Sequence, residues 1–545
     1  MRLEKLRTAY CLLRSCVPSP GSRAPLRSKQ YAVRNSVRGA LLLCGVSLGG
    51  CASVFRETAV GPNGLAPAEQ RLRDALADGR WEAAVKAASS TKRGAPRDRL
   101  LRDLFAGTAA YYAGRWEESA DAFERAASLA DDRYTKSASR AALALTTNDL
   151  ALPYVPGQNE RLLVHYYALL AWLRRGSLPD AAVEARRLGF LMQQYDAGRT
   201  PLDGPTRALL RYVSGAVFAA AGDANDAAVA FRNARALDAG VLPDTALLGD
   251  DAPDGFTGAA TAPWDDVRAA SADSGDVLVL LEQGFVAHRV EQRLAVRGRD
   301  DGAWRVFLGA GRRQTWGGDA LARAASLLTG DEGVWADAPM APLALDAGLT
   351  DADSAADTAA DRAPDADGTS VVADSGGVTP PRRRHAIMRA LLTWPAYRRA
   401  VPQPPATLVV DSGPALALLR ADLSAAEAAD FERDRAARLA RLLVRTALRE
   451  AAVSELDRKH HEIASLVRSV SGAVERADTR SWHLLPGVVG VTRVRLPVGE
   501  HAVAALVDGA RVSLGTVRVT AGGLALASAR VWRRGVTPAP ALSAR

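Results

Sequence analysis

The feature that most constrains this fold is a helical pattern that recurs between residues 66 and 242 of the 545-residue chain. Within it, Ala/Leu/Arg-rich helices are separated by turns that begin at Gly79, Gly114, Gly176 and Gly222. Glycine accepts the backbone conformation of such turns, and small residues let helices approach closely. The turn glycines lie 35, 62 and 46 residues apart, so the repeat is irregular. The two most regular copies share glycine, alanine and phenylalanine positions: Gly107, Gly114, Phe123 and Ala126; and Gly215, Phe218, Gly222, Ala227, Phe231 and Ala234.

This unit resembles the tetratricopeptide (TPR) repeat, a helix–turn–helix unit of about 34 residues. The resemblance implies a short TPR-like α-solenoid, whose first helices line a concave face where ligands usually bind. The register places Tyr112, Tyr166, Arg174 and Tyr212 on that face, as candidate protein-binding residues. The alternative for each residue is packing or solvation, and the alternative for the region is a helical bundle.

A different pattern is present at residues 34–51. Arg34 and Arg38 precede a short apolar run at residues 40–48, and the motif Leu-Gly-Gly-Cys then ends at Cys51. The pattern resembles a bacterial lipoprotein signal, which implies cleavage before Cys51 and lipidation of its thiol. The chain would then be anchored to a membrane by lipid and would not span it. The alternative is a buried apolar segment that contains a cysteine.

Cleavage at this position would change the composition of the chain. Residues 1–50 carry nine Lys/Arg against Glu4, so their removal reduces the formal charge from +9 to +1 and argues against a nucleic-acid partner. The other three cysteines also precede Cys51, which excludes a disulfide within the mature chain. Ala52 carries no signal for inner-membrane retention, so the resemblance favours the outer membrane, facing the periplasm.

The rest of the chain alternates between strand, acidic and helical patterns. The apolar run at residues 276–281 predicts a buried strand, and the Asp-rich stretch at 336–384 predicts disorder. We therefore expect a multidomain α+β fold, with the α-solenoid followed by a mixed β/α region and a C-terminal antiparallel β-meander. The expected segments are a leader and signal (1–50), a tether (51–65), TPR-like repeats (66–242), a linker with β-rich segment (243–335), the acidic insertion (336–384), a mostly helical segment (385–476), a β domain (477–535) and a tail (536–545).

The mostly helical segment contains one long helix, predicted from Ser424 to about Arg476. Ser424 and Glu427 have the spacing of a capping box, in which each side chain bonds the other residue's backbone. Four arginines at 438, 441, 445 and 449 share one face of this helix. We interpret this face as solvated and paired with nearby acids, with contact to anionic lipid head groups as the alternative.

The sequence contains no complete catalytic, metal-binding or cofactor-binding motif. It lacks a phosphate-binding Gly-x-x-x-x-Gly-Lys-Ser/Thr loop, and His461-Glu462 begins a zinc-protease motif whose second histidine position holds Ser465. We therefore predict no cofactor and no enzymatic activity. Glu282, Arg480 and Trp482 stand out, and we interpret them as buried polar or core aromatic residues.

The order of features along the chain resembles an uncharacterised family of bacterial TPR-containing lipoproteins. The resemblance rests on residues 162–195, 275–290, 394–397 and 477–499. It implies an architecture and an envelope location, but no activity. We expect an adaptor or scaffold that binds another envelope protein. The alternatives are a structural component of a secretion or surface-appendage assembly, and an accessory that binds or processes an envelope polymer.

Overall fold

The computed structural model covers most of the predicted helices and strands. Cys51, the predicted lipidation residue, lies outside the described residues. So do the predicted leader, most of the predicted tether, nearly all of the Asp-rich stretch at 336–384 and the C-terminal segment 536–545. The described residues are 64–90, 96–135, 149–196, 204–237, 272–298, 304–308, 312–315, 335–336, 388–413, 415–458, 460 and 476–532.

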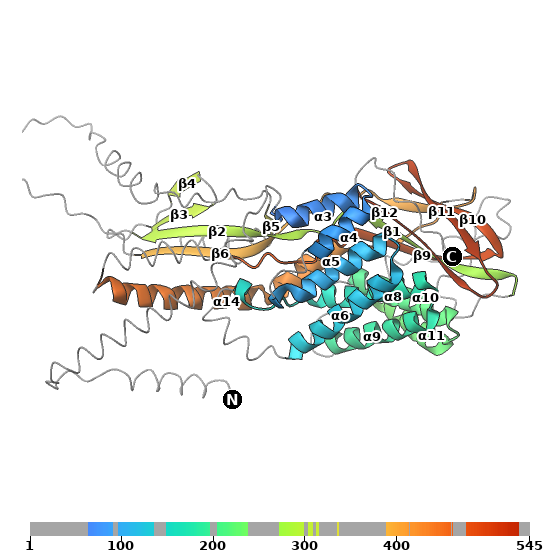
Figure 1. Cartoon of the computed structure of the whole chain (residues 1–545), viewed down its shortest axis with the longest axis horizontal. Coiled ribbons are helices and arrows are strands. Elements are labelled where there is room, and N and C mark those ends of the chain that lie inside the picture. Colours follow the sequence, from blue (N-terminus) through green and yellow to red (C-terminus); the bar gives the residue numbers. More distant parts are fainter. Residues whose placement is uncertain are drawn as a thin grey trace, which may run out of the picture. The chain divides into compact units, whose positions relative to one another are not determined.

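The region of predicted repeats forms helices that pack in consecutive pairs (Figure 1). Each pair also contacts the next, because α4 packs on α5, α6 on α8, and α9 on α10. This array is the helical half of the mixed α and β fold predicted from the sequence. The pairs are α3 (Pro67–Ala77) with α4 (Trp81–Ser90), α5 (Arg99–Tyr112) with α6 (Trp116–Thr135), α8 (Gln158–Arg175) with α9 (Leu178–Asp196), and α10 (Gly204–Ala220) with α11 (Ala224–Leu237).

The turn glycines have the conformation that the sequence predicts. Gly79, Gly114, Gly176 and Gly222 have φ angles of 68°, 75°, 85° and 82°, a region that L side chains rarely adopt. Each lies between the two helices of a pair, so the turn closes without a strained side chain. This confirms the predicted helix–turn–helix units.

The β half is a sandwich of two sheets. Strands β12, β1, β9 and β8 form one sheet in that order, and β11, β10 and β7 form the other. Apolar side chains from both sheets meet in a shared core that includes Val279, Leu408, Val503 and Val517. The strands are β1 (Ser274–Gln283), β7 (Ala406–Val410), β8 (Leu419–Asp422), β9 (Val488–Pro497), β10 (Gly499–Val507), β11 (Ala510–Val519) and β12 (Leu524–Val531).

The predicted C-terminal meander is wrong in its topology. The β10–β11 hairpin is present, and its Asp508 and Gly509 have positive φ angles of 52° and 76°. However, β9 and β12 belong to the other sheet, where both pair with β1, β12 in a parallel direction. Strand β1, which lies between β9 and β12 in this sheet, comes from a much earlier segment of the chain. No local turn signal reveals such a pairing.

Strand β1 is buried on both faces, which explains its continuous apolar sequence. Val277, Val279 and Leu281 face the other sheet, whereas Leu278 and Leu280 join the core formed with the helices. The helical array and the sandwich therefore share one core. Both belong to the compact unit Ala59–Arg545.

A third sheet, with strand order β4-β3-β2-β6-β5, extends from the sandwich through the long strands β2 and β6. These two strands are antiparallel and pair from His288 with Arg398 to Gly298 with Met388. The long helix α14 packs against β6 (Figure 1). The elements are β2 (His288–Gly298), β3 (Trp304–Leu308), β4 (Arg312–Thr315), β5 (Trp335–Ala336), β6 (Met388–Arg398) and α14 (Leu423–Asp457).

The segment at 385–476, predicted to be mostly helical, thus also contributes β6, β7 and β8. Its helix begins one residue before the predicted Ser424. Asp422, not Ser424, caps it, because its Oδ1 accepts hydrogen bonds from the backbone of Ser424 and Ala425. The Ser424 hydroxyl instead accepts the backbone N–H of Ala287, 2.9 Å away, which ties the helix to the β1–β2 connection.

Replacement of Gly215 tests the close helix packing of the array. A Cβ at Gly215 would lie 2.6 Å from the Phe231 ring, so Gly215→Ala should lower the free energy of unfolding by about 1–3 kcal/mol. Gly189→Ala is the matched control, because its nearest neighbour would be 4.0 Å away and alanine favours the helix. Chemical denaturation that finds equal effects at both positions would contradict the packing.

Candidate functional site

The surface where helices meet the sheet contains a buried carboxylate. Glu282 follows Leu278 and Leu280 at alternate positions of β1, so it faces the helices with them. It is 3 % exposed. Its Oε2 accepts the Tyr112 hydroxyl and its Oε1 accepts the Tyr167 hydroxyl, each at 2.6 Å. Residues from α5, α8 and β1 thus meet at one charge.

Arg530 of β12 supplies the positive charge of this cluster. Its Nη1 donates to the Tyr112 hydroxyl, 2.8 Å away, and its other N–H groups donate to the carbonyls of Gly284, Leu484 and Leu485. The guanidinium also lies 4.0 Å from the ring centre of Trp532. A charged group that is 1 % exposed therefore has hydrogen-bond partners on all sides.

The hydroxyls that bind Glu282 stay protonated. Burial and the Glu282 charge raise the pKa of Tyr167 well above its ordinary value. Burial raises the pKa of Tyr112 in the same direction, against the opposing effect of Arg530. Both tyrosines are consequently hydrogen-bond donors at neutral pH. Since each Glu282 oxygen already accepts such a bond, the arrangement is suited to holding elements together.

The four predicted protein-binding residues lie at this same surface. Tyr112 binds Glu282, and the Tyr212 hydroxyl accepts the backbone N–H of Arg493 in β9, 3.0 Å away. Arg174 donates to the Leu526 carbonyl and the Ser528 hydroxyl of β12, at 3.1 and 2.6 Å.

Tyr166 is also fully buried, and its hydroxyl has no hydrogen-bond partner. The side of the first helices on which the sequence places these four residues is thus covered within the chain. It contacts the chain's own sheet, so these side chains are not exposed to a separate partner.

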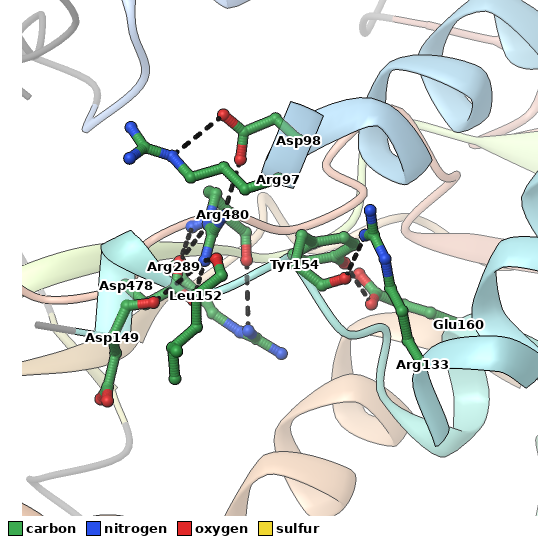
Figure 2. Close-up of polar contacts among 10 residues, drawn as sticks. All are labelled: Arg97, Asp98, Arg133, Asp149, Leu152, Tyr154, Glu160, Arg289, Asp478 and Arg480. Atoms are coloured by element: carbon green, nitrogen blue, oxygen red, sulfur yellow. Dashed lines mark hydrogen bonds and ion pairs between the residues drawn. The ribbon is translucent and has the colours of Figure 1, made fainter. Parts of the chain in front are cut away.

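A second polar cluster surrounds Arg480 (Figure 2). Its Nη1 donates to Asp98 at 2.6 Å, its Nε donates to Asp478 at 2.8 Å, and its Nη2 donates to the Leu152 carbonyl at 3.1 Å. Burial alone would raise the pKa of Asp478, but the Arg480 charge and hydrogen bonds lower it. Asp478 therefore stays ionised. The ion pair between Arg480 and Asp98 connects the 476–487 segment to the residue before α5.

Trp482 lies next to this cluster and is 1 % exposed. Its backbone N–H donates to Glu160 at 2.8 Å, and its indole N–H donates to the Thr108 hydroxyl at 2.9 Å. Glu160 also accepts the Tyr154 hydroxyl (Figure 2). The interpretation of Glu282, Arg480 and Trp482 as buried polar or core aromatic residues is confirmed.

A third cluster, around Arg73, was not foreseen from the sequence. The Arg73 guanidinium lies 4.2 Å from the Phe285 ring centre, and its Nη1 is 3.2 Å from Nδ1 of His288. Burial and the Arg530 charge lower the pKa of Arg73 to about 9. His483 lies close by, 4.8 Å from the ring centre of Phe105. Arg73, His288 and His483 are 215 and 195 positions apart in the sequence, so no local motif joins them.

Among the described residues, no group of histidine, cysteine and acidic side chains could hold a metal ion. The described helices are also too short or too polar to cross a membrane. His461 and Glu462 lie outside the described part of the chain. Comparison with protein-family models finds no matching family, and comparison with curated proteins finds no matching relative.

Removal of one hydroxyl at a time tests whether the Glu282 cluster stabilises the fold. Tyr167→Phe leaves a buried carboxylate oxygen without its donor and should lower the free energy of unfolding by about 1–3 kcal/mol. Tyr166→Phe, one residue away on α8, removes a hydroxyl without a partner and should leave stability unchanged or slightly higher. Equal losses in chemical denaturation would contradict the account.

Stability should also fall at mildly acidic pH because of His483. Burial, with Arg73 and His288 nearby, lowers its pKa well below 6.5, and neither ring nitrogen has a hydrogen-bond partner. Below pH 6.5 the unfolded chain therefore binds a proton that the folded chain does not, so stability decreases by up to about 1.4 kcal/mol per pH unit. His483→Phe should flatten this dependence between pH 7.5 and 5. An unchanged slope in denaturation at several pH values would refute the assignment.

Proposed function

We propose that the chain is a lipid-anchored protein of the bacterial cell envelope that acts as a scaffold for another envelope protein. The anchor is the lipid on Cys51, and the scaffold is a TPR-like α-solenoid built from the paired helices α3 to α11. The proposal draws on the signal-like residues 34–51 and on the glycine turns that separate stacked helix pairs. Such arrays present extended surfaces to partners.

The observation that best supports the scaffold proposal is that one side of the helical array is covered and the other is exposed. The chain's own strands cover the sheet-facing side of the helices, through contacts such as those of Arg174 with Ser528 and of Tyr212 with Arg493. A partner must then use the outer helices of the pairs. A solenoid whose inner face is closed also keeps a fixed shape, which suits a scaffold.

The outer helices carry a candidate patch. Phe190 on α9 is 61 % exposed, and Val183, seven residues earlier on the same face, is also exposed. Val229 is exposed on α11. Arg186 of α9 forms ion pairs with Asp223, which precedes α11, and with Asp226 in its first turn. An exposed aromatic residue between apolar neighbours and arginines has the composition of a protein-binding surface. We assign it to a partner with an apolar surface.

The anchor is tested by metabolic labelling of the full chain with a clickable fatty acid. The chain should incorporate the label, and Cys51→Ala should abolish incorporation because no other thiol follows the cleavage position. Cys44→Ala is the control and should keep the label. Label retained by Cys51→Ala, or absent from the parent chain, would refute the anchor.

The partner surface is tested by cross-linking in cells and purification in mild detergent. Phe190→Glu places a charge in the patch and should reduce the yield of a stoichiometric partner at least tenfold. Val401→Glu changes an equally exposed apolar residue outside the helical array and should leave the yield unchanged. Equal yields from both variants would exclude this patch.

A further inference from the structure

The connection between β6 and β7 is rich in proline and lies at the surface. Residues 399–405 read Arg-Ala-Val-Pro-Gln-Pro-Pro, and they belong to no helix or strand. Among the described residues, no large apolar side chain is more exposed than Val401, at 72 %. We call residues 399–405 the proline segment.

The sequence of the proline segment favours a polyproline II helix. The rings of Pro402, Pro404 and Pro405 hold the φ angle at about −65°. A residue that precedes proline is restricted to extended conformations, and this applies to Val401, Gln403 and Pro404. All five residues are therefore limited to the region of polyproline II, a helix with about three residues per turn and no internal backbone hydrogen bonds.

The exposure of the side chains follows the same three-residue period. One edge of the segment faces solvent, and it carries Arg399, Pro402 and Pro405. The next edge is half-buried, and it carries Ala400, Gln403 and Ala406. This pattern is the one expected of a polyproline II helix that lies along the surface with one edge against the protein.

Contacts on the half-buried edge hold the segment in place. Both alanines of this edge pack against apolar clusters of the fold. The Gln403 carbonyl accepts a hydrogen bond from Arg420 at 2.7 Å, and the Pro404 carbonyl accepts one from Gln283 at 3.1 Å. These donors satisfy carbonyls that a polyproline II helix leaves unpaired, so the segment has its conformation before any partner binds.

We propose that the proline segment is a docking site for a partner domain of the SH3 type, whose groove is lined with aromatic side chains. Such grooves bind a preformed polyproline II helix, and pairs of an apolar residue and a proline fit between the aromatic rings. The segment has two such pairs, Val401-Pro402 and Pro404-Pro405, which begin three residues apart and so repeat after one turn. Val401, Pro402 and Pro405 are exposed, and Pro404 is half-buried.

Arg399 indicates the charge of the partner and the direction of docking. It is exposed and precedes Pro402 by three residues, so it lies on the same edge as the exposed prolines. A groove that receives both pairs also meets this guanidinium at one end. Electrostatic complementarity then requires an acidic side chain at that end of the groove.

The size of the segment sets the strength of this interaction. A ligand of seven residues makes a small interface, so the complex is transient. The fixed backbone reduces the entropy that is lost on binding. The proline segment lies outside the helical array, and its docking does not depend on the lipid anchor or on the Phe190 patch.

The test is titration of the full chain, in mild detergent, into a labelled SH3 domain selected for Arg-x-x-Pro-x-x-Pro peptides. Fluorescence anisotropy should show saturable binding, and Pro402→Ala or Pro405→Ala should each weaken it at least tenfold. Pro497→Ala is the matched control, because it replaces an exposed proline elsewhere and should have no effect. Absence of saturable binding, or equal loss with Pro497→Ala, would overturn the proposal.

Charge variants test the direction of docking and separate this site from the Phe190 patch. Arg399→Glu should weaken binding at least tenfold at low salt, whereas Arg518→Glu changes an exposed arginine of β11 and should not. Val401→Glu should also weaken binding at least tenfold, and Phe190→Glu should leave it unchanged. Binding that tolerates Arg399→Glu, or that Phe190→Glu reduces as much as Val401→Glu, would contradict the assignment.

Discussion

The fold depends on the enclosed charge of Glu282. A carboxylate removed from water costs several kcal/mol unless hydrogen bonds and opposite charge compensate for it. Here the compensation comes from Tyr112 of α5, Tyr167 of α8 and Arg530 of β12. Any arrangement that separates these elements leaves a buried charge without partners. The cluster therefore specifies how the helices sit on the sheet, in addition to the apolar core around it.

The packing of the helices on the sheet determines which surfaces of the helical array are exposed to solvent. The side of the helical array that would ordinarily receive a ligand is closed by the sandwich through Arg174, Tyr212 and the Arg480 and Trp482 contacts. The exposed apolar side chains of the helical array then lie on its outer helices, such as Phe190 of α9 and Val229 of α11. His483 adds a second kind of constraint, because its burial beside Arg73 keeps the imidazole neutral and makes the stability of the fold depend on pH.

Local patterns in the sequence predicted local structure well. The glycine turns, strands β1 and β9 to β12 and the long helix all followed from residue spacing, because turn conformation and side-chain periodicity are properties of neighbouring residues. The partner of each strand did not follow. β1 pairs with strands more than 200 residues later in the chain, and three strands of the sandwich lie in segments without hairpin signals. The orientation of α14 was also missed: the four arginines predicted on a solvated face are half-buried. Spacing shows which residues share a face but not which face is covered.

The same limit applies to the candidate site. Spacing placed Tyr112, Tyr166, Arg174 and Tyr212 on one side of the helices, and the structure brings them to the sheet-facing surface. Their occupant could not be predicted, because it consists of strands distant in sequence. Glu282 stood out only as a charge at the end of an apolar run, and its tyrosine donors became visible once α5 and α8 were placed against β1.

If the contacts around Glu282 hold the fold together, the helices and the sandwich should unfold as one cooperative unit. Native-state hydrogen exchange of the full chain, followed by mass spectrometry in increasing denaturant, tests this directly. The account predicts that peptides from α5 and α8 and peptides from β1 and β12 lose protection at the same denaturant concentration. Loss of protection in the helices while β1 and β12 remain protected would contradict it.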